Sequence, residues 1–430
     1  MTTPARTIEK SGAPQRPGTS PHLSWLHPLG LISLSVYNFV MRFLTLGIHH
    51  FWGKNEVRKR IWSSIRVEGE PLEYTGTGAE LFRGFLVIFG IVFLPVMLAT
   101  FSVAVFFGPD SGISKGFQGG LYLAFLLLTG VAIYRAQRYR LSRTRWRGIR
   151  ASLVGSSLKY GWTYFWTMLL VPVTLGWISP WRATRLQRIT TDDMRFGTTA
   201  FSFTASSRPL YGPFATFWLL MVAFLAALPF LVTAIVPWPD MFAASETGEF
   251  KPPRPEDMAR IVVGVYFALF LLGVVYMILS AWYRAAMIRH FSRHTHIDGL
   301  SFASTVTPGG LMWITVSNFL LLVAGAVVAT ATLAAIGLFI WTLAGAGLGS
   351  AIGDSIPPEQ IGGVLGVPMV LLFFLAMGML LPVAQARSTG YLVSHLRLDG
   401  TLDTAAIEAS AEQNIKRGEG LAQAFDIDAL

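Results

Sequence analysis

The sequence contains no cysteine and few charged residues, and each lack excludes a class of protein. Without cysteine among its 430 residues, the chain has neither disulfides nor thiolate metal sites. Charged residues make up 13% of the chain and hydrophobic residues 53%, whereas an average soluble protein is about 25% charged. These proportions exclude a water-soluble globule. The chain also lacks phosphate-binding loops and nucleophile-elbow motifs, so no catalytic residue is assigned.

The sequence contains long apolar runs without charged residues. The sequence has six stretches that contain no Asp, Glu, Lys or Arg. Most of them have the length of ~20 residues that a helix needs to cross a bilayer, which predicts a mainly helical, polytopic membrane protein. The fifth run has 33 residues, so its helix must tilt, break or protrude, with Gly325 and Gly337 as weak points. The six runs are 84–107, 119–134, 213–238, 261–283, 311–343 and 364–383.

The charges that are present gather in blocks between these runs. Block 135–161, for example, carries eight Lys and Arg and no acid. Three connectors, 108–118, 239–260 and 344–363, together carry four Lys and Arg against eight acids. Basic residues near span ends stay in the cytoplasm, which predicts cytoplasmic blocks, outer connectors and cytoplasmic termini. The predicted cytoplasmic blocks are 54–83, 135–161, 182–212, 284–310 and 384–403.

Two further apolar segments, 30–52 and 162–181, are ambiguous. The blocks flanking 162–181 are both basic, so both lie in the cytoplasm only if this segment does not cross the membrane. We therefore predict a membrane domain over 30–405 with two re-entrant or interfacial elements; the alternative is eight spans. The three predicted transmembrane hairpins are 84–134, 213–283 and 311–383, and the predicted tails are a disordered one at 1–29 and a polar one at 406–430.

The basic blocks also repeat one another around a glycine. A basic or aromatic residue stands nine positions before the glycine in each of five copies. Short segments such as 65–67 and 200–203 resemble strands flanking a glycine turn, which predicts a cytoplasmic layer of β-hairpins. The motif Thr-Leu-Gly occurs in both ambiguous segments, at 45–47 and 174–176. The five turn glycines are Gly69, Gly148, Gly197, Gly299 and Gly400.

Several of these motifs together resemble the YjgN family of bacterial inner-membrane proteins, a family of unknown function. The resemblance covers roughly residues 25–405. The chain departs from the family over residues 320–380, a segment longer than the single membrane element expected there. It implies an inner-membrane location but no activity, substrate or catalytic residue. The motifs are Thr45-Leu46-Gly47, Phe51-Trp52, Gly69, Tyr74-Thr75-Gly76-Thr77, Trp146-Arg147-Gly148-Ile149-Arg150, Thr174-Leu175-Gly176, Pro180-Trp181 and His395-Leu396-Arg397-Leu398-Asp399-Gly400.

The candidate binding residues are arginines. Those in the second block alternate with aromatic residues, as side chains that contact anionic lipid headgroups do. Arg42 either faces a cavity and holds an anion or headgroup, or extends to the membrane surface. The candidate headgroup or anion contacts are Arg42, Arg138, Arg143, Arg145, Arg147 and Arg150.

Other chemistries receive no support from the sequence. His290 and His294 are four residues apart, as metal ligands on a helix are, but only Asp298 is near them, so we predict no metal site and no cofactor. No sequence-reading element accompanies the basic residues, so we expect a lipid rather than a nucleic-acid partner. The sequence predicts a non-enzymatic pore or carrier for a small or lipid-like solute. The alternative is a membrane scaffold or lipid-interaction protein with a cytoplasmic β layer.

Overall fold

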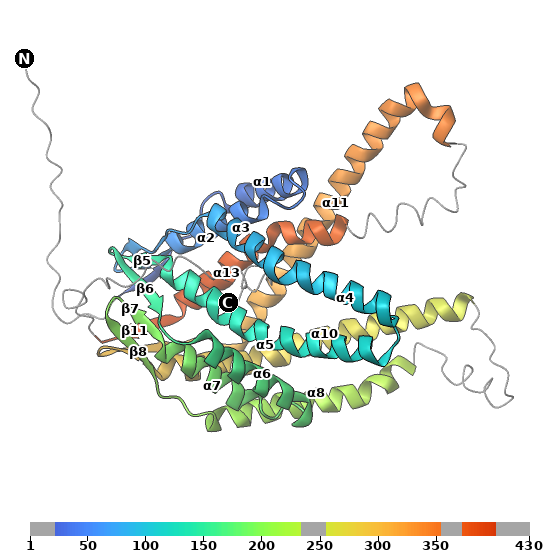
Figure 1. The fold of residues 1–430 in the computed structure, drawn as a ribbon. Coiled ribbons are helices and arrows are strands. Elements are labelled where there is room, and N and C mark those ends of the chain that lie inside the picture. The colour runs from blue at the N-terminus through green and yellow to red at the C-terminus, as the bar shows by residue number, and fades with distance from the viewer. Residues whose placement is uncertain (1–21, 234–254, 354–371, 401–430) are drawn as a thin grey trace, which may run out of the picture.

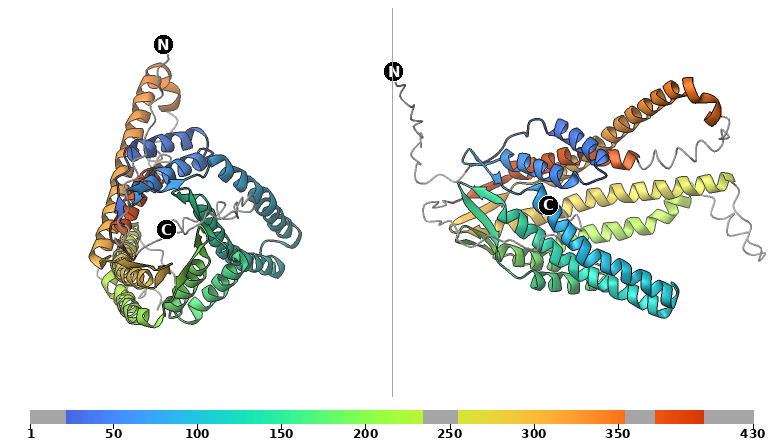
Figure 2. Two further views of the ribbon diagram at one scale, coloured as in Figure 1. Left: turned by 90° about the vertical axis from the view of Figure 1, so that its left-hand side faces the viewer. Right: turned by 45° about the horizontal axis from the view of Figure 1, so that its top comes forward.

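A computed structural model describes residues 22–233, 255–353 and 372–400 of the chain. Its short strands gather at one end, and its long helices extend away from them (Figure 1). Viewed from the strand end, the helices stand around a common axis (Figure 2, left). The polar tail predicted at 406–430 and most of the tail predicted at 1–29 lie outside the described residues.

The strands form two antiparallel sheets. The larger has eight strands in the order β11-β10-β9-β8-β7-β6-β5-β4, and the smaller has the order β1-β2-β3. The bounds are β1 Leu23–Trp25, β2 Ile65–Val67, β3 Glu70–Pro71, β4 Glu73–Tyr74, β5 Thr144–Trp146, β6 Ile149–Leu153, β7 Met194–Phe196, β8 Thr199–Phe203, β9 Thr295–Ile297, β10 Leu300–Ser304 and β11 Leu396–Asp399.

Positive backbone dihedrals mark the turns between the strands. Gly69, Gly148, Gly197 and Gly299 have φ between 57° and 81°, and Gly400 follows β11 with φ 119°. A left-handed φ is strained for residues with a Cβ and free of strain for glycine, which explains the glycine that each copy repeats. In three copies the preceding residue is also left-handed, as a tight two-residue hairpin turn requires.

Each group of helices begins after one strand and ends before a strand that pairs with it. We call such a group a helical excursion, and every excursion therefore returns to the strand end. The five excursions are closed by the pairs Trp25↔Ile65, Tyr74↔Thr144, Leu153↔Met194, Phe203↔Thr295 and Ser304↔Leu396. In chain order they contain α1 (Leu31–Leu44) and α2 (His50–Ser64); α3 (Gly78–Ile88), the π-helical η1 (Phe89–Phe93), α4 (Leu94–Phe107) and α5 (Gly112–Ser142); α6 (Ser157–Val173) and α7 (Ser179–Asp192); α8 (Arg208–Thr233) and α10 (Pro255–Arg293); and α11 (Pro308–Gly353), the 3-10 helix η2 (Gly378–Leu380) and α13 (Leu381–Ser394).

Six helices of the described chain are long and apolar enough to cross a membrane, which confirms the prediction of a polytopic helical protein. They are Gly78–Phe107, Gly112–Ser142, Arg208–Val232, Met258–Arg293, Pro308–Gly337 and Leu372–Ser394. Of the three outcomes predicted for the fifth run, a break at its glycines does not occur: α11 is one helix through Gly325 and Gly337 and extends at an angle to its neighbours (Figure 1). At Gly325 a Cβ would collide with Leu380, so this glycine allows a close helix contact instead of a break.

The two ambiguous segments fold into the same helical hairpin. In each, a threonine hydroxyl donates to the carbonyl four residues earlier, and the leucine and glycine that follow are left-handed, with φ 50° and 92° at Leu46 and Gly47 and φ 48° and 86° at Leu175 and Gly176. The amide of that glycine donates over 2.7 Å to the carbonyl five residues earlier. Both hairpins begin and end at paired strands, which agrees with re-entrant elements and disagrees with eight spans.

One segment differs from the prediction. Leu23–Trp25, placed in a disordered tail by sequence reasoning, forms strand β1 and pairs with β2. Trp25 packs on the cluster of Leu31, Val57, Ile61 and Ala386, and its ring lies against Gly390, where even a Cβ would collide. Burial of one large aromatic ring against two distant helices therefore orders this short strand.

Candidate functional site

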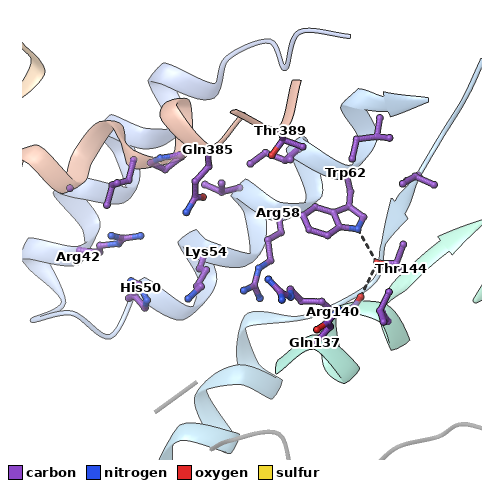
Figure 3. Close-up of a pocket in the computed structure, with 18 residues that line it drawn as sticks. Arg42, His50, Lys54, Arg58, Trp62, Gln137, Arg140, Thr144, Gln385 and Thr389 are labelled. Carbon is purple, nitrogen blue, oxygen red and sulfur yellow. Dashed lines mark hydrogen bonds between the residues drawn. The ribbon is translucent and has the colours of Figure 1, made fainter. Parts of the chain in front are cut away.

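A cavity of about 490 Å³ lies between α1, α2, α5 and α13, beside strands β2 and β5 (Figure 3). Its walls thus come from the first, second and last helical excursions, which lie far apart in the sequence. We call it the basic pocket, after Arg42, Lys54, Arg58 and Arg140, which line it. A volume between ~300 and ~1,000 Å³ is typical of small-molecule sites.

The cations of the basic pocket come from three helices. Arg42 lies in the last turn of α1. His50, Lys54 and Arg58 are spaced four residues apart on α2, so they share one face of that helix. Figure 3 shows Lys54 and Arg58 projecting from this face toward Arg140 of α5. None of the 18 lining residues that the structure describes is Asp or Glu, and these residues together carry a formal charge of +4 with His50 neutral.

The remaining wall is neutral and largely apolar. Val57, Ile61, Leu141 and Leu381 contribute alkyl groups, and Trp62 contributes an indole. The Trp62 Nε1 donates to Thr144 Oγ1 over 2.8 Å, which fixes the ring in place. Four neutral polar side chains also line the cavity, namely Gln137, Thr144, Gln385 and Thr389. The pocket therefore offers cations, hydrogen-bonding groups and an apolar face together.

Tyr74 on β4 lies behind the pocket wall, close enough for two of the same cations to affect the pKa of its hydroxyl. Its side chain is 6% exposed, and burial raises the pKa of its hydroxyl, while the nearby charges of Arg58 and Arg140 act in the opposite direction. Both guanidinium groups thus lie close to one buried phenol. This proximity agrees with the convergence of α2 and α5 in Figure 3.

A second, smaller cavity of about 160 Å³ lies among the strands. All five copies of the repeat contribute side chains to it. Leu72 lines both this cavity and the basic pocket, which places the two next to each other. We call its apolar lining the collar, formed by Val67, Leu72, Trp146, Phe196, Phe201, Ile297, Leu300, Phe302 and Leu398.

The predicted arginines do not form one site. Arg42 lines the basic pocket, but Arg143 pairs with Glu80 at 3.1 Å and Arg147 pairs with Glu68 at 3.0 Å and with Glu70. Arg138 donates to the Gly155 carbonyl. Arg145 and Arg150 face each other across β5 and β6.

Sequence reasoning missed Lys54 and Arg58 and did not select Arg140. A signal was present on α2, because His50, Lys54 and Arg58 recur every four residues on one face of this helix. No comparable signal connects α2 with Arg140, which lies more than 80 residues later. Their convergence follows from the return of both helices to adjoining strands.

The histidines of the fourth block serve structural contacts. His290 and His294 have ring centroids 4.5 Å apart, and a ring nitrogen of His290 lies 2.7 Å from the Ser206 carbonyl oxygen. Within the described ranges, no group of three His, Asp or Glu side chains is placed to hold a metal ion.

Comparisons with known proteins give a family but no activity. The sequence model of a family described as bacterial protein of unknown function (DUF898) matches residues 30–424. The inner membrane protein YjgN of Salmonella typhimurium is 25% identical over 145 residues, which are 33% of this chain and 32% of that protein. The match therefore spans about a third of that relative's length. No solved structure is significantly similar to the chain.

Proposed function

The chain belongs to the bacterial family of proteins of unknown function DUF898, and we propose that it is a non-enzymatic inner-membrane pore or carrier for a small or lipid-like solute. Six membrane-length helices and the name of the relative YjgN support the inner-membrane location. The positive-inside rule supports a cytoplasmic strand end, because the basic blocks lie there.

The observation that carries the proposal is the pair of adjoining cavities at the strand end. The collar is lined by every copy, and through Leu72 it adjoins a polar pocket, two of whose helices, α5 and α13, belong to membrane-length segments. Polar groups within a membrane domain are costly, and they commonly mark a solute site. An apolar ring beside a polar chamber has the form of a gate, since narrow hydrophobic constrictions exclude water and ions.

Enzymatic activity has less support from the same two cavities. Among the described residues, the lining of the basic pocket includes a histidine but no carboxylate, and the lining of the smaller cavity includes Glu68 but no histidine. General acid–base catalysis and activated nucleophiles commonly require such groups within hydrogen-bonding reach of one another. We therefore assign the cavities to binding and passage.

Flux through reconstituted protein tests the proposal. Purified protein in liposomes would be assayed for uptake of inorganic phosphate, glycerol and glucose, with empty liposomes as the baseline. The collar rings of Phe201 and Phe302 stack with centroids 6.3 Å apart, so replacing both by alanine widens the constriction. We expect at least one solute to pass several-fold faster through this variant than through the unaltered chain.

Ser202→Ala provides a matched control, because Ser202 lies on β8 next to Phe201 and points to the opposite face. It should leave the flux unchanged. Flux at the empty-liposome baseline for both the unaltered and the widened protein would contradict a pore or carrier. It would favour the scaffold alternative, in which the strand end binds partners at the membrane.

A further inference from the structure

We propose that the face of the strands opposite the collar binds the acidic segment 401–430 of the same chain. We call this surface the basic face, because each copy of the repeat places one basic residue on it at the same register position. The inference goes beyond the proposed function, since it holds whether or not the protein moves a solute. The five repeated members of the basic face are Arg66, Arg145, Arg195, His296 and Arg397.

Strand register places these five side chains on one side of the strands. Neighbouring residues along a strand point to opposite faces, and residues paired across an antiparallel ladder point to the same face. The residue that follows each basic member lines the collar, so the basic members themselves point away from it. The collar residues concerned are Val67, Trp146, Phe196, Ile297 and Leu398.

The basic face is accessible to solvent and carries an excess of positive charge. Arg397 is exposed, and the other four repeated members are partly exposed. Arg150 lies opposite Arg145 and adds a fifth arginine to this face. Two acids share the face, namely Glu73 opposite Arg145 and Asp399 two residues after Arg397. Arginines therefore outnumber acids on this face of the described strands.

The segment 401–430 has the opposite charge. It carries six acids against two basic residues, which makes it complementary to the basic face. The family's sequence model matches through residue 424, so most of this segment belongs to what the family shares. The six acids are Asp403, Glu408, Glu412, Glu419, Asp426 and Asp428.

The connection of the chain favours this segment over a separate partner. Strand β11 carries Arg397 and ends at Asp399, so residue 401 follows close to the last member of the basic face. Alternate strands of a sheet lie roughly 10 Å apart, so the members on β5, β7, β9 and β11 span about 30 Å. Thirty extended residues span at most about 100 Å, which is long enough to reach all of them. Attachment to the same chain also gives the acids an effective concentration of about millimolar.

Spin labels in the full-length protein, purified in neutral detergent, test the inference. The chain lacks cysteine, so Ala200→Cys and Ser410→Cys can each carry one label. Ala200 is exposed on β8 and paired with Arg195, which puts its label on the basic face. We expect the distance measured by electron paramagnetic resonance to lie within the ~30 Å of the face in low salt and to lengthen in high salt, which screens exposed charges. A long, broad distance distribution that salt does not change would overturn the inference.

Charge reversal locates the contact. Arg145→Glu together with Arg195→Glu should lengthen the distance between the two labels, and Glu408→Lys together with Glu412→Lys should do the same. Combining all four substitutions should restore the short distance, because the reversed charges attract one another again. The control is Arg185→Gln, which removes an exposed cation of α7 outside the basic face and should leave the distance unchanged. A short distance that persists after both reversals would refute the basic face as the binding surface.

A second label pair separates release of the segment from loss of the fold. The labels at Ala200→Cys and Asp110→Cys lie at opposite ends of the described helices, and their distance should be the same in every variant. A short distance lost in the charge reversals with this second distance unchanged supports the inference. A long distance between face and segment in the unaltered protein, together with binding of phosphatidylglycerol vesicles that Arg195→Glu abolishes, would assign the face to a lipid surface and overturn it.

Discussion

Gly161 of helix α6 allows this helix to pack closely on the membrane-length helix α5. A Cβ on Gly161 would stand 2.5 Å from Val131 Cγ2, 3.1 Å from the Val131 nitrogen and 3.3 Å from the Leu127 carbonyl oxygen. A Cβ on Gly130, across the contact, would stand 2.9 Å from the Gly161 Cα. Backbone atoms cannot change rotamer, so Gly161→Ala must push the two helices apart.

The size of the effect follows from comparison with Gly120→Ala on α5. A Cβ at Gly120 meets no atom within 4 Å. Both substitutions gain the same helix propensity, up to about 1 kcal/mol, so this gain cancels between them. The remaining difference is the cost of overpacking, about 1–3 kcal/mol in a well-packed contact. Gly161→Ala should therefore be less stable than Gly120→Ala by about that amount.

Unfolding by titration with sodium dodecyl sulfate, followed by tryptophan fluorescence, measures this difference. The midpoint of Gly161→Ala should lie below that of the unaltered protein, and the midpoint of Gly120→Ala should lie at or above it. If Gly161→Ala were as stable as Gly120→Ala, the close packing of α6 on α5 would be refuted, and with it the re-entrant hairpin as described.

Three further predictions concern the strand end. Arg147→Gln removes ion pairs to two glutamates, but the Arg147 side chain is 27% exposed, so the loss in unfolding free energy should be only about 0–1 kcal/mol and should shrink in high salt; a loss of several kcal/mol would contradict this. Burial raises the pKa of the Tyr74 hydroxyl above its value in the unfolded chain, so the protonated phenol contributes its full stabilisation below pH ~10. At higher pH the unfolded chain releases this proton first, and that stabilisation is lost. Tyr74→Phe should therefore reduce the loss in unfolding free energy measured between pH 9 and 11. In the cysteine-free chain, an impermeant thiol reagent added outside intact cells should label Asp110→Cys and leave Thr198→Cys unlabelled, and the reverse pattern would invert the proposed orientation.

The sequence predicted the repeated architecture well because each copy carries its own local signal. A glycine with left-handed φ is required at every strand turn, and the Thr-Leu-Gly motif forms the same helical turn at 45–47 and 174–176. Apolar runs of membrane length likewise predicted the six long helices. Sequence left open whether the helix of the fifth run tilts, breaks or protrudes, and α11 does not break at its glycines, because glycine within a packed helix also allows close contact, as Gly325 does against Leu380.

The site was less predictable because its residues converge only in the folded chain. The run of arginines in the second block suggested headgroup contacts, but Arg147 is paired with glutamates 77 and 79 residues earlier in the chain. Linear charge patterns do not reveal such partners. Conversely, Arg58 and Arg140 become neighbours only because β4 and β5 pair and bring the ends of α2 and α5 together.

Cysteine accessibility within the membrane-length segment Leu372–Ser394 tests most directly whether a water-filled polar pocket lies inside the membrane domain. Gln385 lines the basic pocket, whereas Leu375, in the same membrane-length helix, is 61% exposed on its outer surface. A thiol reacts as the thiolate, which forms in water and is suppressed in hydrocarbon. In membranes made permeable on both sides, Gln385→Cys should react with a charged thiol reagent and Leu375→Cys should not. An unreactive Gln385→Cys beside a reactive Leu375→Cys would contradict the account.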